Sequence, residues 1–405
     1  MRFNLLADGW QVEQAQNLSL AAASNPLQLP ADARDVRLRL ADGPAAAYLG
    51  NLDDLLEYPY GGVEQTASQL LPLSIAYPAL AGGEPRIRDR LRLIMQNSRL
   101  RLVQMAGPDA WFAWWGGDVD GDAFLTAYAY YADWYASRAL EIQLPAEHWQ
   151  RILEPYAKQA TQTPLLQRAL ILAFARDMQL PVNTLLGGLL NDLANAGEGQ
   201  ARAEPLEADD GLVLGDPDSA VGLAAARVLA VDLARQLRVA VPAPLAAQAE
   251  TATQRLREAG LPFTDALLAS RSAVDGQQAS ALLQRLAPAQ STLERALALT
   301  WLQGALAQEP QGKLPQPPKD WQAQRGASGE TYWQWRGRGI PSWVDLDEAP
   351  ARPLPVALSY RSAQAPSGQL PVQISRRLLR LVPGEGAFEF KVEEVGDKPL
   401  SSDEL

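Results

Sequence analysis

The stretch from Tyr58 to Thr66 constrains this chain more than any other part. It reads Tyr-Pro-Tyr-Gly-Gly-Val-Glu-Gln-Thr, and an apolar run from Leu70 to Leu80 follows it. The pair Gly61-Gly62 leaves the backbone free to take positive φ angles. Glu64 would then stand in a first helical turn, where a carboxylate suits the positive end of the helix dipole. The pattern predicts a tight turn that leads directly into a helix.

The same stretch resembles the thioester region of the bacterial α2-macroglobulins, which are relatives of the complement proteins. The family pattern is Tyr-Pro-Tyr-Gly-Cys-x-Glu-Gln-Thr, with the Cys side chain joined to the Gln side chain as an internal thioester. Here Gly62 stands at the Cys position, and the chain contains no Cys. The resemblance therefore implies a retained scaffold without the reactive bond, and we expect methylamine to add no mass to the protein. The degenerate motif consists of Tyr58, Pro59, Tyr60, Gly61, Gly62, Val63, Glu64 and Gln65.

A second distinctive stretch runs from Trp111 to Gly117 and is rich in aromatic residues. It can be read as aromatic core followed by a glycine turn, or as one wall of a pocket. It resembles the Phe-Ala-Trp-Trp loop of the same family, which lies near the thioester, where an aromatic cover would keep water from a strained bond. The predicted wall consists of Trp111, Phe112, Trp114, Trp115 and Tyr128.

Strand-like and helix-like patterns divide the chain into three parts. Residues 36–40 alternate apolar and polar side chains, as a half-buried strand does. From about residue 46 to residue 307, Ala and Leu dominate and Gly or Pro clusters recur at about one-helix intervals. The helix expected at residues 65–80 should kink or end at Pro72 and Pro78, and a single helix is expected at residues 146–160. Short β-like runs then follow beyond residue 349, at residues 356–360, 372–374, 378–382 and 387–392. The order predicts a mainly α fold in which a ring of helices is inserted between β segments.

The resemblance supplies names for these parts. It implies an α/α toroid, the thioester domain of the family, inserted into a CUB-like β-sandwich and followed by a macroglobulin-like sandwich. Both ends of the chain read as cut, so we expect a piece of a longer protein. The expected parts are a β segment of the split CUB-like sandwich (1–45), the toroid (46–347), the return strands of that sandwich (348–374) and the start of a truncated macroglobulin-like domain (375–405).

Composition excludes several classes of function. The net charge is −11, which argues against a nucleic-acid binder, because phosphate neutralisation needs a basic surface. Without Cys and with His148 as the single His, the chain offers no thiolate site, no His-based triad and no multi-His metal site. No apolar run approaches the roughly 18 residues of a membrane span. We expect no cofactor.

Three further features have simple structural interpretations. Asp118, Asp120 and Asp122 are spaced as in an EF-hand, but Gly121 is at position four of that loop rather than six, and Ala129 takes position twelve, where a bidentate Glu is required. We therefore expect a turn and helix cap rather than a metal site. We expect His148 to be structural or exposed and dispensable. A basic helix is expected to be a solvated face, or alternatively a contact with another domain or with anionic lipid. Its arginines are Arg86, Arg88, Arg90, Arg92, Arg99 and Arg101.

The resemblance implies a periplasmic protease trap whose longer parent is cut by proteases in a bait region and rearranges to entangle them. We expect this segment to contribute to capture without a covalent bond and without catalysis. The expected partners are proteases, neighbouring domains and other envelope proteins, and the parent is expected to be a lipoprotein of the inner membrane. An α/α-toroid enzyme related to glycoside hydrolases or terpene cyclases is an alternative, with Glu64, Asp118 and Asp120 as candidate carboxylates. A docking module for envelope proteins is another.

Overall fold

The computed structural model describes residues 12–40, 61–80, 85–114, 120–197, 213–286, 292–308, 314–325, 331–362, 378–383 and 390–395. The chain divides into two compact units. One comprises Glu13–Ser362, and the other comprises Met1–Val12 with Ala363–Leu405.

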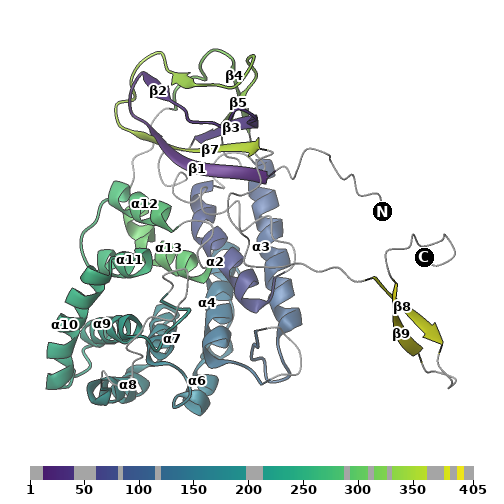
Figure 1. Cartoon of the computed structure of the whole chain (residues 1–405). Coiled ribbons are helices and arrows are strands. Elements are labelled where there is room, and N and C mark those ends of the chain that lie inside the picture. Colours follow the sequence, from purple (N-terminus) through teal and green to yellow (C-terminus); the bar gives the residue numbers. More distant parts are fainter. Residues whose placement is uncertain are drawn as a thin grey trace. The chain divides into compact units, whose positions relative to one another are not determined.

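The helical part of the first unit forms a closed ring (Figure 1). Going round it, α2 packs against α4, α4 against α7, α7 against α9, α9 against α10, α10 against α11, α11 against α13, and α13 against α2. The predicted ring of helices is therefore confirmed. The helices are α2 (Val63–Leu80), α3 (Pro85–Met105), α4 (Ala123–Ala139), α5 (Ala146–Gln150), α6 (Leu153–Gln159), α7 (Leu165–Asp177), α8 (Asn183–Asn195), α9 (Ala220–Leu237), α10 (Ala243–Ala259), α11 (Pro262–Ser270), α12 (Gly276–Arg285) and α13 (Thr292–Leu306).

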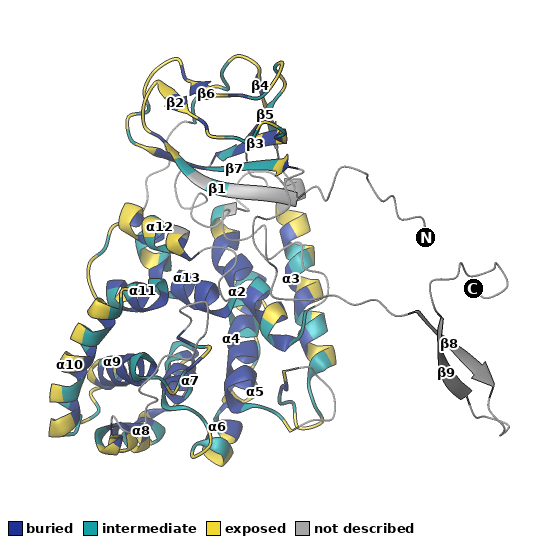
Figure 2. Cartoon of the chain, viewed as in Figure 1, coloured by how far each residue is buried: buried dark blue, intermediate teal, exposed yellow. Residues whose placement is uncertain are grey.

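Burial separates the helices into two kinds (Figure 2). In α4 and α9 most residues are buried on all sides of the helix, as in a helix that other helices surround. In α10 the buried residues are confined to one stripe, Leu245, Ala249, Ala252 and Leu256, which is the pattern of a helix with one face in solvent. None of the described helices combines the length and the hydropathy that crossing a membrane requires.

The structure corrects two details of the predicted helices. Of the kink or end predicted at Pro72 and Pro78, it excludes the end, since α2 continues through both to Leu80. The neighbouring side chains Leu70, Leu71 and Leu73 are fully buried, so tertiary packing outweighs the local cost of proline. The single helix predicted for residues 146–160 is divided into α5 and α6.

The β part of the first unit is built from strands that precede the helices in the sequence and strands that follow them. A five-stranded sheet has the order β1-β7-β3-β5-β4, and β2 pairs with β6. Within it, β3 is antiparallel to both β5 and β7. The strands are β1 (Val12–Leu20), β2 (Ser24–Pro26), β3 (Arg34–Leu40), β4 (Trp321–Arg325), β5 (Thr331–Trp335), β6 (Trp343–Asp345) and β7 (Leu354–Ser362). The helices are thus inserted between strands of one sheet.

Alternation in β3 sets which face of the sheet is buried. Val36, Leu38 and Leu40 point into a core that also contains Trp333 and Leu358, as the period-two pattern of residues 36–40 predicts. Among the described elements, α13 is the last helix, and β4, β5 and β6 belong to the sheets.

In the second unit the structure describes one antiparallel hairpin, β8 (Leu378–Pro383) with β9 (Phe390–Val395). Both strands overlap strands predicted from the sequence. The strand predicted at residues 372–374 lies outside the described residues.

The N-cap of α4 provides a first prediction. The Asp122 carboxylate accepts a hydrogen bond from the Leu125 N–H at 2.7 Å, whereas Asp120 is exposed. Replacing an N-cap Asp by Ala typically costs about 1 kcal/mol. We expect Asp122→Ala to lower the free energy of unfolding by about this amount in urea denaturation. Asp120→Ala is the matched control, and an equal loss in both variants would contradict the assignment.

The buried Glu294 provides a second prediction, which concerns pH. Its side chain in α13 is buried and accepts a hydrogen bond from the Leu214 N–H at 2.7 Å. Burial raises the pKa of Glu294 from 4.5 to about 7. The folded chain therefore holds this proton more tightly than the unfolded chain does, and stability falls as pH rises between about 4.5 and 7.

We expect Glu294→Gln, which stays neutral, to remove this part of the pH dependence. Its free energy of unfolding relative to wild type should rise between pH 4.5 and pH 7, by an amount on the order of 1 to 3 kcal/mol. Parallel denaturation curves across the pH range measure the difference. A constant difference would mean that Glu294 titrates alike in the folded and unfolded chains.

Candidate functional site

The predicted turn leads into α2, and Gly62 is the last residue before that helix. Thr66 donates two hydrogen bonds to the Gly62 carbonyl oxygen, from its N–H at 3.0 Å and from Oγ1 at 2.9 Å. The Gly62 N–H donates to Gln65 Oε1 at 3.1 Å. Gln65 therefore does what the third helical residue does in a capping box, where its side chain returns to the N-cap amide. Tyr58, Pro59 and Tyr60 lie outside the described residues.

Gly62 also lies against the aromatic segment. A Cβ atom added at Gly62 would stand 2.6 Å from the Trp114 carbonyl oxygen, closer than real Cβ contacts come. Neither Gly61 nor Gly62 adopts a positive φ angle, so the expected reason for the glycines is corrected. At Gly62 the requirement is the close approach of the Trp114 main chain.

Glu64 joins three helices through hydroxyl groups. Ser68 Oγ donates to Glu64 Oε1 at 2.8 Å, and Thr292 Oγ1 at the start of α13 donates to the same oxygen at 2.9 Å. Ser68 Oγ also lies 2.9 Å from the hydroxyl of Tyr128 in α4. Burial and the charge of Glu64 raise the pKa of Tyr128 well above its usual value. The carboxylate thus connects α2, α4 and α13 beside the Gly62 turn.

The aromatic segment is held by the start of α4. The Phe112 N–H donates to Thr126 Oγ1 at 2.9 Å, and the Phe112 carbonyl oxygen accepts from the Asp122 N–H at 2.8 Å. Phe112 is buried, with its ring edge-on to Tyr130 at 5.9 Å between centroids. Trp114 leaves 45% of its surface exposed.

The described residues of the predicted pocket wall lie in different surroundings. Phe112 and Tyr128 lie in the core, Trp111 is half-buried with Lys158 Nζ 5.1 Å from its ring, and Trp114 faces solvent in part. Trp115 lies outside the described residues. The two motifs do meet, through the Gly62 and Trp114 main chains, but whether they enclose a pocket remains a prediction.

The contact between the Gly62 turn and the Trp114 main chain is called the Gly62 junction here. Contacts from distant parts of the chain complete it, and no pattern in the sequence indicates them. Arg101 in α3 donates from Nη2 to the Gly61 carbonyl oxygen at 2.8 Å, and Thr292 reaches Glu64 across 228 residues. Arg101 belongs to the predicted basic helix, but no local pattern shows which arginine turns inward. A hydroxyl residue at a helix start, such as Thr292, is ordinarily interpreted as a helix cap, so its contact with Glu64 is not predicted.

The remaining predicted residues lie elsewhere. In the basic helix, Arg99 Nε lies 2.5 Å from Asp133 Oδ1, and Arg88 and Arg90 are exposed. His148 is half-buried beside Tyr130 and Trp149, with ring centroids 5.5 and 4.6 Å away. Burial lowers the pKa of His148.

The structure describes two of the three carboxylates of the enzyme alternative. Glu64 is held by two hydroxyl groups, and Asp120 is exposed. Asp118 lies outside the described residues. Among the described residues, no group of three or more His, Cys, Asp or Glu side chains could hold a metal ion.

No family model matches this chain. The α2-macroglobulin of Ralstonia nicotianae is 38% identical over 398 residues, which span 94% of this chain and 25% of the relative. The chain therefore spans about a quarter of the length of this curated relative.

Solved structures show the same fold. Native α2-macroglobulin of Escherichia coli, from domain MG7 to the C-terminus, superposes with a TM-score of 0.50 at 19% identity, covering 92% of this chain and 59% of that one. A mutant of Salmonella α2-macroglobulin also gives a TM-score of 0.50, at 17% identity, covering 92% of this chain and 24% of that one. With a sequence match that runs through almost all of its residues, the chain belongs to the bacterial α2-macroglobulin family.

Proposed function

We propose that this chain is the thioester-domain region of a bacterial protease trap that captures proteases without a covalent bond. The single observation that carries the proposal is the Gly62 junction. It has no sulfur to form a thioester, and the carboxamide of Gln65, which would supply the acyl carbon, caps the Gly62 amide instead. The motif is thus retained as a joint between α2 and the aromatic segment.

The contacts around the Gly62 turn support a rigid connection between the helices, through which movement of one part of the domain reaches the others. Glu64 connects α2 to α13 through Thr292, and Arg101 connects α3 to the turn. A part held on several sides moves as a body. The exposed face of Trp114 beside this rigid turn suits contact with a neighbouring domain, because a large aromatic side chain buries much apolar area.

The longer protein gives this part its setting. We place it in the periplasm, anchored to the inner membrane as a lipoprotein, with proteases as the captured partners and a bait region outside the present chain. In this setting the region catalyses no reaction and contributes the domain that moves when the bait region is cut. Binding of other envelope proteins without any protease would favour a docking module instead.

The capture proposal is tested on the longer protein that contains this chain. After incubation with an endoprotease, we expect the protease to co-elute with it in native size-exclusion chromatography. The same sample should separate completely in denaturing electrophoresis, because no thioester has reacted. Absence of native co-elution would reject capture, and a denaturant-resistant conjugate would reject the non-covalent mechanism.

The close approach at Gly62 gives a stability prediction for the chain itself. A methyl group at Gly62 must displace the Trp114 main chain, and overpacking of this kind costs about 1 to 3 kcal/mol. We therefore expect Gly62→Ala to lower the free energy of unfolding in urea denaturation.

Gly304→Ala in α13 is the matched control, because a Cβ atom there meets nothing within 4 Å. It should leave the chain as stable or stabilise it by roughly 0.5–1 kcal/mol. A Gly62→Ala variant as stable as Gly304→Ala would mean that the aromatic segment does not press on the turn.

Restoring the family residue tests how much of the reactive site remains. We expect Gly62→Cys to carry a free thiol that a disulfide reagent titrates, because Gln65 is turned to the backbone and the added Cβ atom displaces Trp114. Gly304→Cys, at an exposed position, calibrates the thiol titration. Formation of a methylamine-sensitive bond in Gly62→Cys would show instead that the pocket is still organised for the thioester.

A further inference from the structure

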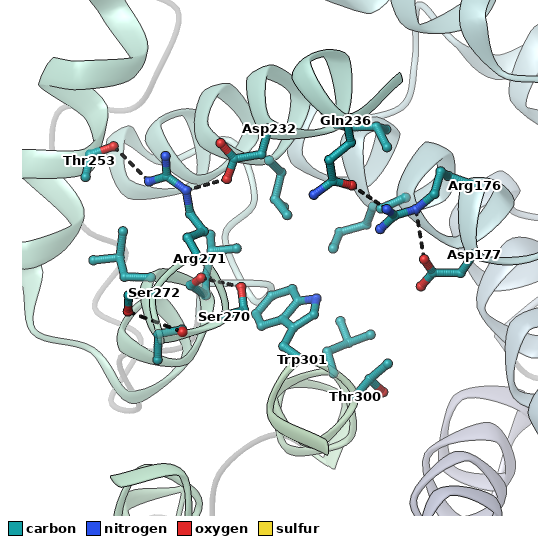
Figure 3. A pocket seen from close by; sticks show the side chains of 18 of the residues that line it. Arg176, Asp177, Asp232, Gln236, Thr253, Ser270, Arg271, Ser272, Thr300 and Trp301 are labelled. Carbon is teal, nitrogen blue, oxygen red and sulfur yellow. Dashed lines mark hydrogen bonds and ion pairs between the residues drawn. The ribbon is translucent and has the colours of Figure 1, made fainter. Parts of the chain in front are cut away.

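A cavity of about 1120 Å³ lies within the helical ring (Figure 3). Most of its lining residues from α7, α9 and α11 come from the C-terminal halves of those helices, whereas the Gly62 junction lies at the start of α2. Exposed residues at its edge, Arg235, Gln236 and Arg257, show that it opens to solvent. Its volume is that of a site for a small molecule or a short peptide.

Most carboxylates in the lining already have arginine partners. The pairs are Arg271 and Arg235 with Asp232, Arg176 with Asp177, and Arg285 with Asp265. Asp177 also accepts a hydrogen bond from the hydroxyl of Tyr131 at 2.7 Å. Glu250 is the remaining acid and is exposed. The cavity therefore has little acceptor capacity left for a cationic ligand.

Donor groups, in contrast, remain available around the opening. Gln236 accepts from Arg176 through Oε1, so its amide NH₂ group is left for another acceptor. Arg271 binds Thr253 and Asp232 through Nη1 and Nε, which leaves its Nη2 group. Arg235 and Arg257 add two exposed guanidinium groups at the edge. Arg235 meets Asp232 through Nη1 alone, in a long contact of 3.9 Å.

The floor of the cavity is apolar. Figure 3 shows the indole of Trp301 between the Arg271–Asp232 pair and the Arg176–Gln236 pair. Leu233 and Leu268 line the same space. A ligand inserted here meets an aromatic ring and aliphatic side chains below and hydrogen-bond donors above.

Helix geometry explains part of this arrangement. The carbonyl groups at helix C-termini carry partial negative charge, and Arg176, Arg235 and Arg271 lie at or beside the last turns of α7, α9 and α11, where cations are favoured. That position does not account for the open space or for the apolar floor between the donors. Together these features describe a recognition site.

We propose that the cavity binds a ligand that carries a carboxylate next to an apolar group. The carboxylate is held by Arg235, Arg257 and the free edge of Arg271, and the apolar group packs on Trp301. Guanidinium groups hold carboxylates by paired, charge-assisted hydrogen bonds. The site is separate from the Gly62 junction and does not depend on protease capture.

Calorimetric titration of the whole chain with N-acetyl-L-phenylalanine tests the proposal. We expect saturable binding in the millimolar range, and binding of the matched N-acetyl-L-phenylalanine amide, which lacks the carboxylate, to be about tenfold weaker or more. The double variant Arg235→Gln/Arg257→Gln should weaken the acid by about tenfold and leave the amide unchanged. Trp301→Phe, which keeps a ring, should weaken both ligands by a few-fold.

Arg238→Gln is the matched control, because Arg238 is exposed at the end of α9 and does not line the cavity. Its affinity for the acid should equal that of wild type. Absence of saturable binding by the folded wild-type chain would overturn the proposal. Equal affinity for acid and amide, or equal losses in the double variant and in Arg238→Gln, would overturn it as well.

Two peptides then separate the sources of such a carboxylate. One ends in a free Phe carboxylate, and the other carries an internal Asp-Phe pair with both ends blocked. Binding of the first alone assigns the site to chain ends, and binding of both assigns it to acidic, apolar segments in general. Binding of neither, with N-acetyl-L-phenylalanine bound, assigns it to small carboxylic acids.

Discussion

The contact between the Gly62 turn and the Trp114 main chain is the constraint on which the candidate site depends. It requires a residue without Cβ at position 62, and it places the aromatic segment over the start of α2. The Gly62 amide and carbonyl group are then satisfied by Gln65 and Thr66. A buried or crowded turn needs such partners, because an unpaired backbone group costs about as much as a lost hydrogen bond. The residues that resemble a reactive centre thus form a helix start.

The ring holds this turn in place from several directions. Thr292 brings the last helix of the ring onto Glu64 of the first, and the tyrosines of α4 pack behind them. The sheet adds a second constraint, since β3 precedes all the described helices while β5 and β7 follow them. Both ends of the helical part are therefore fixed by contacts between residues far apart in sequence, which is the organisation that a domain inserted into a sandwich requires.

Much of the fold could be predicted from the sequence because its signals are local. Ala- and Leu-rich runs with caps such as Asp122 and Ser219 define the helices, and alternation defines β3 and β5. Pro72 does not end α2, because the packing of its buried neighbours outweighs a local rule. The strands between residues 321 and 345 are short, and only their pairing with distant strands assigns them to the sheet.

The candidate site also has a part that local sequence predicts and a part that depends on distant contacts. The motif around Gly62 and Gln65 was visible in the sequence because the resemblance carries it residue by residue. The contacts that complete the site were not, since Thr292 and Arg101 reach it from distant helices. Glu294 gave no signal either, because a glutamate in a first helical turn ordinarily suits the helix dipole. Only its burial, which the whole fold determines, raises its pKa.

The Gln65 side chain serves the fold as a cap of the Gly62 amide. Amide hydrogen exchange at Gly62, measured by NMR in wild type and in Gln65→Leu, tests it most directly. A hydrogen bond worth about 1 kcal/mol predicts exchange roughly fivefold faster in the variant, with unchanged rates in the core of α4. Equal Gly62 exchange rates in the two proteins would show that the Gln65 side chain does not protect the Gly62 amide.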